Sequence, residues 1–146
     1  MTIHRLKRTL QTLLLSLAVA ASAGAGEAGF KVIVNASNPV SSLTKDQVSR
    51  MFLKKVQKWD SGQSVVPVDQ DANSPVRAVF SKDVHGKAVS AVASFWQQQI
   101  FAGRDVPPAE KAGDAAVLAF VRGNPNAIGY VSEGAATGDV KVVPVQ

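Results

Sequence analysis

The stretch Val65-Val-Pro-Val-Asp-Gln-Asp-Ala-Asn-Ser-Pro-Val-Arg-Ala-Val-Phe80 changes from a strand pattern to a helix start. Its first four residues are valine-rich and predict a short strand. Pro67 has no N–H to donate, so we expect this strand at a sheet edge, or with that position turned outward. Ser74 and Pro75 match a helix start, because serine caps the first turn and proline suits the first helical position. A strand followed closely by a helix is typical of an α/β domain.

Helix and strand signals alternate on both sides of this stretch. Thr44 and Gln47 form a capping box, and Leu43 and Val48 flank it as a hydrophobic staple, so a helix is expected to begin here. The other expected elements are a strand at 30–34, helices at 87–101 and 114–122, and strands at 127–131 and 140–143. This order predicts an α/β fold in which helices flank one small mixed sheet.

The helix expected at 87–101 carries one apolar face. That face consists of Val89, Val92, Phe95, Trp96 and Ile100. Their spacing places them on one side of a helix that Gly103 stops, and we expect that side to be buried. Residues expected in the interior or at its edge are Phe52, Trp59, Phe80, Phe95, Trp96, Phe120 and Ile128.

Residues 1–23 have the pattern of an export signal. The basic start consists of His4, Arg5, Lys7 and Arg8. The apolar run Leu13–Ala23 follows, and Ala21-Ser-Ala23 supplies a small-residue cleavage pattern. A membrane-spanning helix would need about 20 apolar residues, and this run is shorter. We therefore expect a signal peptide at 1–23, one domain at 24–146, a periplasmic location and no stable membrane insertion.

The charge balance argues for a small partner. Three of the sixteen basic residues and none of the eleven acidic ones lie in 1–23, so the remaining chain has thirteen and eleven, a net charge of +2. This mild positive balance suits a small anion. The sequence has no stripe of basic residues interleaved with aromatics, so a nucleic-acid partner is not expected. It also has no cysteine, which excludes disulfides and thiol catalysis.

The helix start at Ser74 is the candidate binding site with the best physical warrant. A helix N-terminus presents unpaired N–H groups and a partial positive charge, and both favour an oxyanion. Asn73 and Ser74 add side-chain donors, and Arg77 lies one turn into the helix, where its guanidinium could donate two hydrogen bonds. Ordinary helix capping explains the same serine without any ligand.

Two further clusters of residues carry alternatives. Ser37 and Asn38 follow the strand at 30–34 and could donate to a ligand, or they could stabilise a turn before Pro39. A basic cluster is formed by Lys54, Lys55 and Lys58. These lysines indicate either a solvated helix end or a contact with an acidic partner such as a permease.

Catalysis has little support in the sequence. Ser74 and His85 could form a triad with Asp69 or Asp71, but no nucleophile-elbow glycines surround Ser74. Without cysteine, and with His85 as the one histidine beyond the expected leader, no usual zinc site can be built. We therefore expect a binding protein without a cofactor or metal, not an enzyme.

Three segments together resemble a known family. They are Met51-Phe-Leu-Lys-Lys-Val-Gln-Lys-Trp59, the stretch at 65–80, and Asn124-Pro-Asn-Ala-Ile-Gly-Tyr-Val-Ser132. In this order, behind an export signal, they are similar to the phosphate-type (PstS-like) periplasmic substrate-binding proteins of ABC importers. That family carries an IFxGKxxxW stretch, a Ser-Gly-Thr turn at a helix start and a late AIGY segment. The resemblance implies a reduced type-II periplasmic-binding-protein fold, with a ligand contact from the loop after the first strand.

The resemblance also implies a function. Ser74 matches the serine of the family's turn, whereas Pro75 stands at the glycine, Val76 at the threonine and Gln70 at an anion-binding arginine. The implied function is weak, reversible binding of phosphate or a related oxyanion, with ABC permease subunits as partners. The alternative is a periplasmic accessory or interaction protein that kept the scaffold and lost the ligand, which the three departures favour.

The leader generates a first prediction. The protein recovered after export should begin at Gly24 or Gly26, because cleavage follows the small residues Ala23 or Ala25. Intact-mass spectrometry checks this. A membrane-bound product that retains Met1 would contradict the signal-peptide interpretation.

Overall fold

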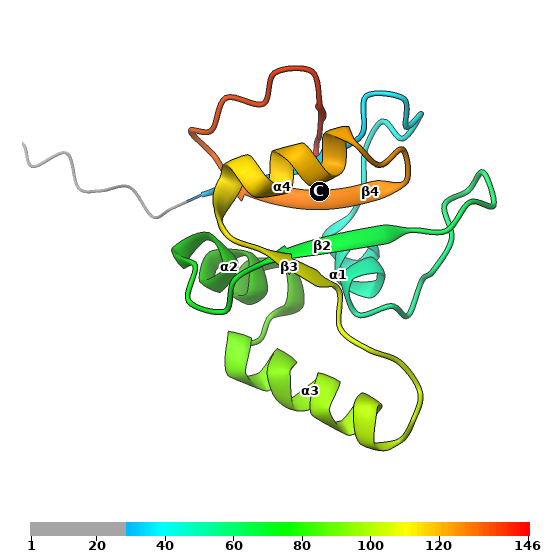
Figure 1. The fold of residues 1–146 in the computed structure, drawn as a ribbon, viewed down its shortest axis with the longest axis vertical. Coiled ribbons are helices and arrows are strands. Elements are labelled where there is room, and N and C mark those ends of the chain that lie inside the picture. Colours follow the sequence, from blue (N-terminus) through cyan, green and yellow to red (C-terminus); the bar gives the residue numbers. More distant parts are fainter. Residues whose placement is uncertain (1–28) are drawn as a thin grey trace, which may run out of the picture.

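The computed structural model describes residues 29–146, so the expected signal peptide and its cleavage site lie outside the described residues. A five-stranded sheet is covered by helices, and one helix stands apart from it (Figure 1). The strands are β1 (Phe30–Val34), β2 (Val66–Gln70), β3 (Ala109–Lys111), β4 (Ala127–Ser132) and β5 (Lys141–Val143). The helices are α1 (Lys45–Phe52), α2 (Pro75–Phe80), the π-helical turn η1 (Ser81–His85), α3 (Val89–Phe101) and α4 (Gly113–Arg122). Within 29–146, none of the helices is both long and apolar enough to cross a membrane.

The sheet is mixed, as the sequence predicts. Its order is β3-β2-β4-β1-β5, in which β2 is parallel to β3 and β4, and β1 is antiparallel to β4 and β5. The carboxyl ends of β2, β3 and β4 therefore meet at one edge of the sheet. The carboxyl end of β1 lies at the opposite edge, because Val34 pairs with Ile128 near the start of β4.

The two predicted helix caps are confirmed. The N–H of Gln47 donates to Thr44 Oγ1 at 3.1 Å, and the N–H of Thr44 donates to Gln47 Oε1 at 2.9 Å, which completes the capping box of α1. Ser74 caps α2 by accepting from the N–H of Arg77 at 3.3 Å, and Pro75 occupies the first helical position. Local side-chain chemistry is thus sufficient to place both helix starts.

Pro67 lies in an internal strand, so the expectation of an edge strand is wrong. The alternative expectation, an outward-facing nitrogen, fits the structure. The N–H of Val66 donates toward β4, to the carbonyl of Asn126 at 3.0 Å. Successive residues of a strand alternate sides, so the nitrogen of Pro67 faces the β3 side. There β3 begins to pair only at Val68, and no ladder bond is lost.

The core divides between the two faces of the sheet. One face packs against α1, α2 and η1 through a cluster of aromatic rings, in which Phe80 stacks on Tyr130 at 3.8 Å and also contacts Phe30 and Phe52. The other face packs against α4. At Gly129 an added Cβ would lie 2.9 Å from side-chain atoms of both Val68 and Val117, so glycine is needed for this close approach.

The apolar face of α3 is buried over a shorter length than the sequence predicts. Val92 and Trp96 are buried, whereas Val89 and Phe95 are half-buried and Ile100 is 52% exposed. The apolar face is therefore buried at Val92 and Trp96 but not at Ile100, at the C-terminal end of the helix. Ile100 stays exposed because α3 lies away from the sheet, which leaves its last turn with few neighbours to pack against (Figure 1).

The difference in burial between Phe80 and Phe95 generates a second prediction. Phe80→Ala should lower the free energy of unfolding by about 3–5 kcal/mol, because the ring is fully buried among other rings. Phe95→Ala serves as the matched change and should cost clearly less, because its ring is half-buried. Urea denaturation measures both, and equal losses would contradict this assignment of the core.

Candidate functional site at the carboxyl edge of the sheet

The edge where β2, β3 and β4 end collects polar side chains. In open α/β sheets, ligands commonly bind outside the carboxyl ends of the strands. Here β2 ends at Gln70, β3 at Lys111 and β4 at Ser132, and the starts of α2 and α4 adjoin them. The polar side chains at this edge are Asp69, Gln70, Ser74, Arg77, Glu110 and Asp114.

Gln70 is the centre of this cluster and is only 2% exposed. Its Nε2 donates to Asp114 Oδ1 at 2.9 Å and to the carbonyl of Tyr130 at 3.1 Å. Its Oε1 accepts from the hydroxyl of Ser74 at 2.8 Å. Its backbone N–H donates to Tyr130 Oη, and its carbonyl accepts from Arg77 Nη1 at 2.8 Å. One residue thus connects β2 to β4, α2 and α4.

Three of the residues predicted for the site lie together at the start of α2. Ser74 is half-buried, and its hydroxyl is used twice, as a donor to Gln70 and as the cap that accepts from the N–H of Arg77. Asn73 is exposed beside it. The capping interpretation of Ser74 is therefore confirmed, and Asn73 as an anion ligand stays a prediction.

Arg77 is buried and has several partners within the chain. Its Nη1 donates to Glu110 Oε1 at 2.6 Å as well as to the carbonyl of Gln70, and its Nε lies 3.6 Å from Asp69 Oδ1. The two carboxylates differ in exposure, because the side chain of Asp69 is 7% exposed and that of Glu110 is 46% exposed. Asp69 therefore contacts the guanidinium of Arg77 from inside the protein, whereas Glu110 contacts the same guanidinium from the solvent side.

Asp69 and Tyr130 form a buried pair beneath this arginine. The hydroxyl of Tyr130 donates to Asp69 Oδ1. Burial raises the pKa of Asp69, although Arg77 and the tyrosine hydroxyl oppose that rise. Burial and the neighbouring carboxylate also raise the pKa of Tyr130, so the hydroxyl keeps its proton and remains the donor.

Asp114 joins the cluster from the first turn of α4. Its Oδ1 accepts from the N–H of Ser132 at 3.0 Å and from the amide of Gln70. Partial burial opposes ionisation, but these hydrogen bonds outweigh it and lower the pKa of Asp114. The edge therefore carries a fixed negative charge close to the start of α2.

Ser37 and Asn38 lie at the opposite edge of the sheet, after β1. The side chain of Asn35 accepts from the N–H of Ser37 at 3.0 Å, and that of Asn38 accepts from the N–H of Val40 at 2.9 Å. This is the turn that the sequence allowed as an alternative. Both residues line a separate cavity of about 320 Å³ beside Trp59. They cannot contact an ion held at Ser74.

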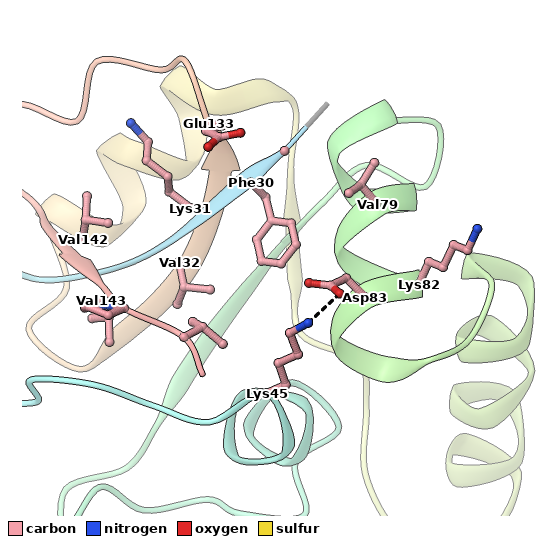
Figure 2. Close-up of a pocket in the computed structure, with 13 residues that line it drawn as sticks. Phe30, Lys31, Val32, Lys45, Val79, Lys82, Asp83, Glu133, Val142 and Val143 are labelled. Atoms are coloured by element: carbon pink, nitrogen blue, oxygen red, sulfur yellow. Dashed lines mark hydrogen bonds and ion pairs between the residues drawn. The ribbon is translucent and has the colours of Figure 1, made fainter. Parts of the chain in front are cut away.

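A larger cavity of about 960 Å³ lies beside the carboxyl edge (Figure 2). Phe30, Val32 and Val143 give it apolar walls, and Lys45 pairs with Asp83 across it at 2.7 Å. None of the residues predicted as ligands lines this cavity. The 960 Å³ cavity and the cluster of polar side chains at the strand ends are therefore two separate places in the molecule.

The catalytic triad that was weighed from the sequence is not assembled in the geometry. His85 Nδ1 lies 2.7 Å from the hydroxyl of Ser49, so its hydrogen-bond partner is not Ser74. Burial, with the nearby charges of Lys87, Arg77 and Lys55, lowers the pKa of His85 to about 4. Among residues 29–146 no group of histidine, aspartate and glutamate side chains could hold a metal ion.

Sequence reasoning missed Glu110, Asp114 and the role of Tyr130 as a hydrogen-bond donor. Glu110 is brought to Arg77 by the pairing of β3 with β2, a contact between distant segments. An acid in the first turn of a helix was the available signal for Asp114. From the sequence, Tyr130 was noted only as part of the segment 124–132 that carries the family resemblance.

Comparison with known proteins agrees with this architecture. One solved structure is that of a protein from Clostridium perfringens described as a phosphate ABC transporter substrate-binding protein with phosphate bound. It is 26% identical, with a TM-score of 0.65, over 81% of this chain and 45% of that one. An ABC-type phosphate transport receptor from Vibrio cholerae shares the fold at 20% identity and the same TM-score, over 81% of this chain and 46% of that one. This chain thus spans less than half the length of each.

The fold is therefore that of the phosphate-type substrate-binding proteins, as the resemblance in the sequence implied. A family model for a PBP (periplasmic-binding-protein) superfamily domain matches residues 24–141. The chain belongs to this superfamily. No protein of curated function matches the sequence.

The buried ion pairs generate a third prediction. Arg77→Ala should lower the free energy of unfolding by about 3–5 kcal/mol, because it leaves Asp69 buried without its cation. Arg122→Ala is the matched control, since Arg122 pairs with Asp139 at the same 2.6 Å that separates Arg77 from Glu110. That pair is exposed, so its loss should cost about 0–1 kcal/mol. Chemical denaturation distinguishes the two, and similar losses would contradict a structural role for Arg77.

Proposed function

We propose that this protein is an exported solute-binding protein that binds phosphate or a related oxyanion weakly and reversibly at the carboxyl edge of its sheet. The observation that carries the proposal is the convergence of three strand ends with the start of α2 in a PBP-superfamily fold. The Clostridium perfringens relative, which is solved with phosphate, supports the choice of ligand.

Only a few hydrogen-bond donors near the start of α2 are available to such an ion. Pro75 has no N–H, and the N–H of Arg77 is used by the cap, so Val76 supplies the first-turn amide that the cap leaves to a ligand. Asn73 offers an exposed side-chain donor beside it. The hydroxyl of Ser74 would have to give up its hydrogen bond to Gln70 Oε1 before it donated to the ion. Arg77 offers the charge, provided that the anion takes the place of Glu110 on its solvent side.

Glu110 therefore competes with the ligand. An oxyanion can pair with Arg77 only after the half-exposed carboxylate moves away, whereas the buried Asp69 stays in place. This competition lowers affinity. An ion on the solvent side of Arg77 also faces water, where electrostatic attraction is weakest. Both effects favour the weak, reversible binding that the proposal describes.

Location and partners complete the proposal. We place the protein in the periplasm after removal of residues 1–23, where it would pass its ligand to ABC permease subunits. The second candidate set, Ser37 and Asn38, lies at the other edge of the sheet and would serve a separate contact with a ligand or partner. No enzymatic step is part of this function.

Titration calorimetry with phosphate and with sulfate tests the site and gives a fourth prediction. Glu110→Gln should raise the affinity about ten- to a hundredfold, because it removes a competing charge worth about 1.5–3 kcal/mol and keeps an acceptor of similar shape. Ser74→Ala should weaken binding and also lower stability by about 1 kcal/mol through loss of the cap. Asp139→Asn is the control, because it removes an equally charged carboxylate from an exposed arginine pair elsewhere.

The outcomes separate the parts of the proposal. Binding that is unchanged in Glu110→Gln would show that the anion does not meet Arg77. An equal gain in Asp139→Asn would reduce the effect to net charge. If neither the wild type nor Glu110→Gln gives heat or a thermal shift with millimolar phosphate or sulfate, oxyanion binding fails. The protein would then be the accessory or interaction protein that the sequence left as the alternative.

A further inference from the structure

The end of α3 and the loop after it expose apolar side chains to solvent. Among residues 29–146, the exposed large hydrophobic side chains are Ile100, Phe101, Val106 and Val142. Three of these four lie between residues 100 and 106, and Phe101 is 94% exposed. Soluble proteins rarely leave several large apolar side chains exposed together without a function.

The exposure follows from how α3 is held. Val92 and Trp96 anchor the helix, and the last turn continues beyond them. Gly103, with a φ of +65°, then reverses the chain, and its N–H closes the turn on the carbonyl of Ile100. The last turn of α3 therefore lies at one extremity of the molecule, away from the sheet (Figure 1).

Basic side chains line a groove along the same helix, and one of them, Arg104, lies in the sequence between Phe101 and Val106. A groove of about 450 Å³ lies between α3 and the segment that follows α1, and Lys54, Lys55 and Arg104 line it together with Phe95 and Trp96. The ammonium group of Lys55 lies over the ring of Phe95, at 5.6 Å from its centre.

The charge of this region is positive. Lys54 has an acidic partner, Asp105, at 3.5 Å. Lys55 and Arg104 are exposed and belong to none of the ion pairs found within the described part of the chain.

We propose that the α3 tip, defined as Ile100, Phe101, Val106, Lys55 and Arg104, binds peripherally to an anionic phospholipid surface. A protruding apolar group beside cations is the arrangement that inserts shallowly at a bilayer interface, while the cations meet lipid phosphates. Phe101, which is almost wholly exposed at a helix end, is the side chain placed to insert. This inference does not rest on the proposed oxyanion function.

Vesicle co-sedimentation of the exported protein, from which the expected leader at 1–23 has been removed, tests this inference and gives a fifth prediction. The probes are vesicles of phosphatidylcholine alone and vesicles containing about one-third phosphatidylglycerol. The wild type should bind the anionic vesicles more tightly, and high salt should weaken that binding. Phe101→Ala should lower the partition coefficient about tenfold, through the lost apolar contact. Arg104→Gln should lower it about fivefold, through one lost charge.

Matched variants identify the surface responsible. Val142→Ala removes an exposed apolar side chain on β5, and Lys82→Gln removes an exposed cation on η1, so both should bind vesicles like the wild type. All forms carry the same N-terminus, so differences among them report on the α3 tip. Circular dichroism should show unchanged helix content, because the substituted residues are exposed.

Three results would overturn the inference. They are equal binding of Phe101→Ala and the wild type, equal binding to neutral and anionic vesicles, and a concentration-dependent dimer that Phe101→Ala abolishes. The last result would assign the tip to a second copy of the chain. Sedimentation velocity without lipid detects it.

Discussion

Every polar group of Gln70 is used inside the protein, and the candidate site depends on that constraint. Its amide and backbone hold the hydroxyl of Ser74, the guanidinium of Arg77, the carboxylate of Asp114 and the backbone and hydroxyl of Tyr130. A buried amide is costly unless all its bonds are made, so this residue fixes the relative positions of β2, β4, α2 and α4. The position at which the resembling family has an anion-binding arginine is here a structural junction.

The charge of the carboxyl edge follows from that replacement. An uncharged residue stands at the centre, and the nearby cation, Arg77, faces one buried and one half-exposed carboxylate, with Asp114 on the other side of Gln70. The fold is that of the family, whereas a glutamine stands where the resemblance implies an arginine. On the proposed function, a phosphate-like ion would meet a positive partner that is already neutralised, and Glu110 would control access to it.

Local sequence rules were enough to locate most of the fold. The capping box at Thr44 and the Ser74-Pro75 start were read from a few neighbouring residues, and both caps form as expected. The mixed sheet also followed from the alternation of elements. Such features depend on short-range chemistry, which a single sequence displays directly.

The features that the sequence did not reveal depend on contacts between distant segments. Arg77 was expected to be open to an anion because nothing near it in the sequence indicates that β3 will bring Glu110 against it. Ile100 continues the apolar spacing of α3, yet the helix extends beyond the body it packs against. Pro67 indicated an edge strand, whereas the late start of β3 leaves room for it inside the sheet. The spacing of apolar residues predicts which side of a helix or strand is apolar. Tertiary packing determines how much of that side is buried.

The place of β1 in the sheet has a consequence for how the protein is made. This strand comes first in the described chain, yet it lies between β4 and β5, and Phe30 pairs with Ser132. Its amides and carbonyls gain their ladder partners only after residues 127–143 have left the ribosome. Pairing across such long stretches of chain slows folding, and the sheet cannot be completed before residues 127–143 are available to it.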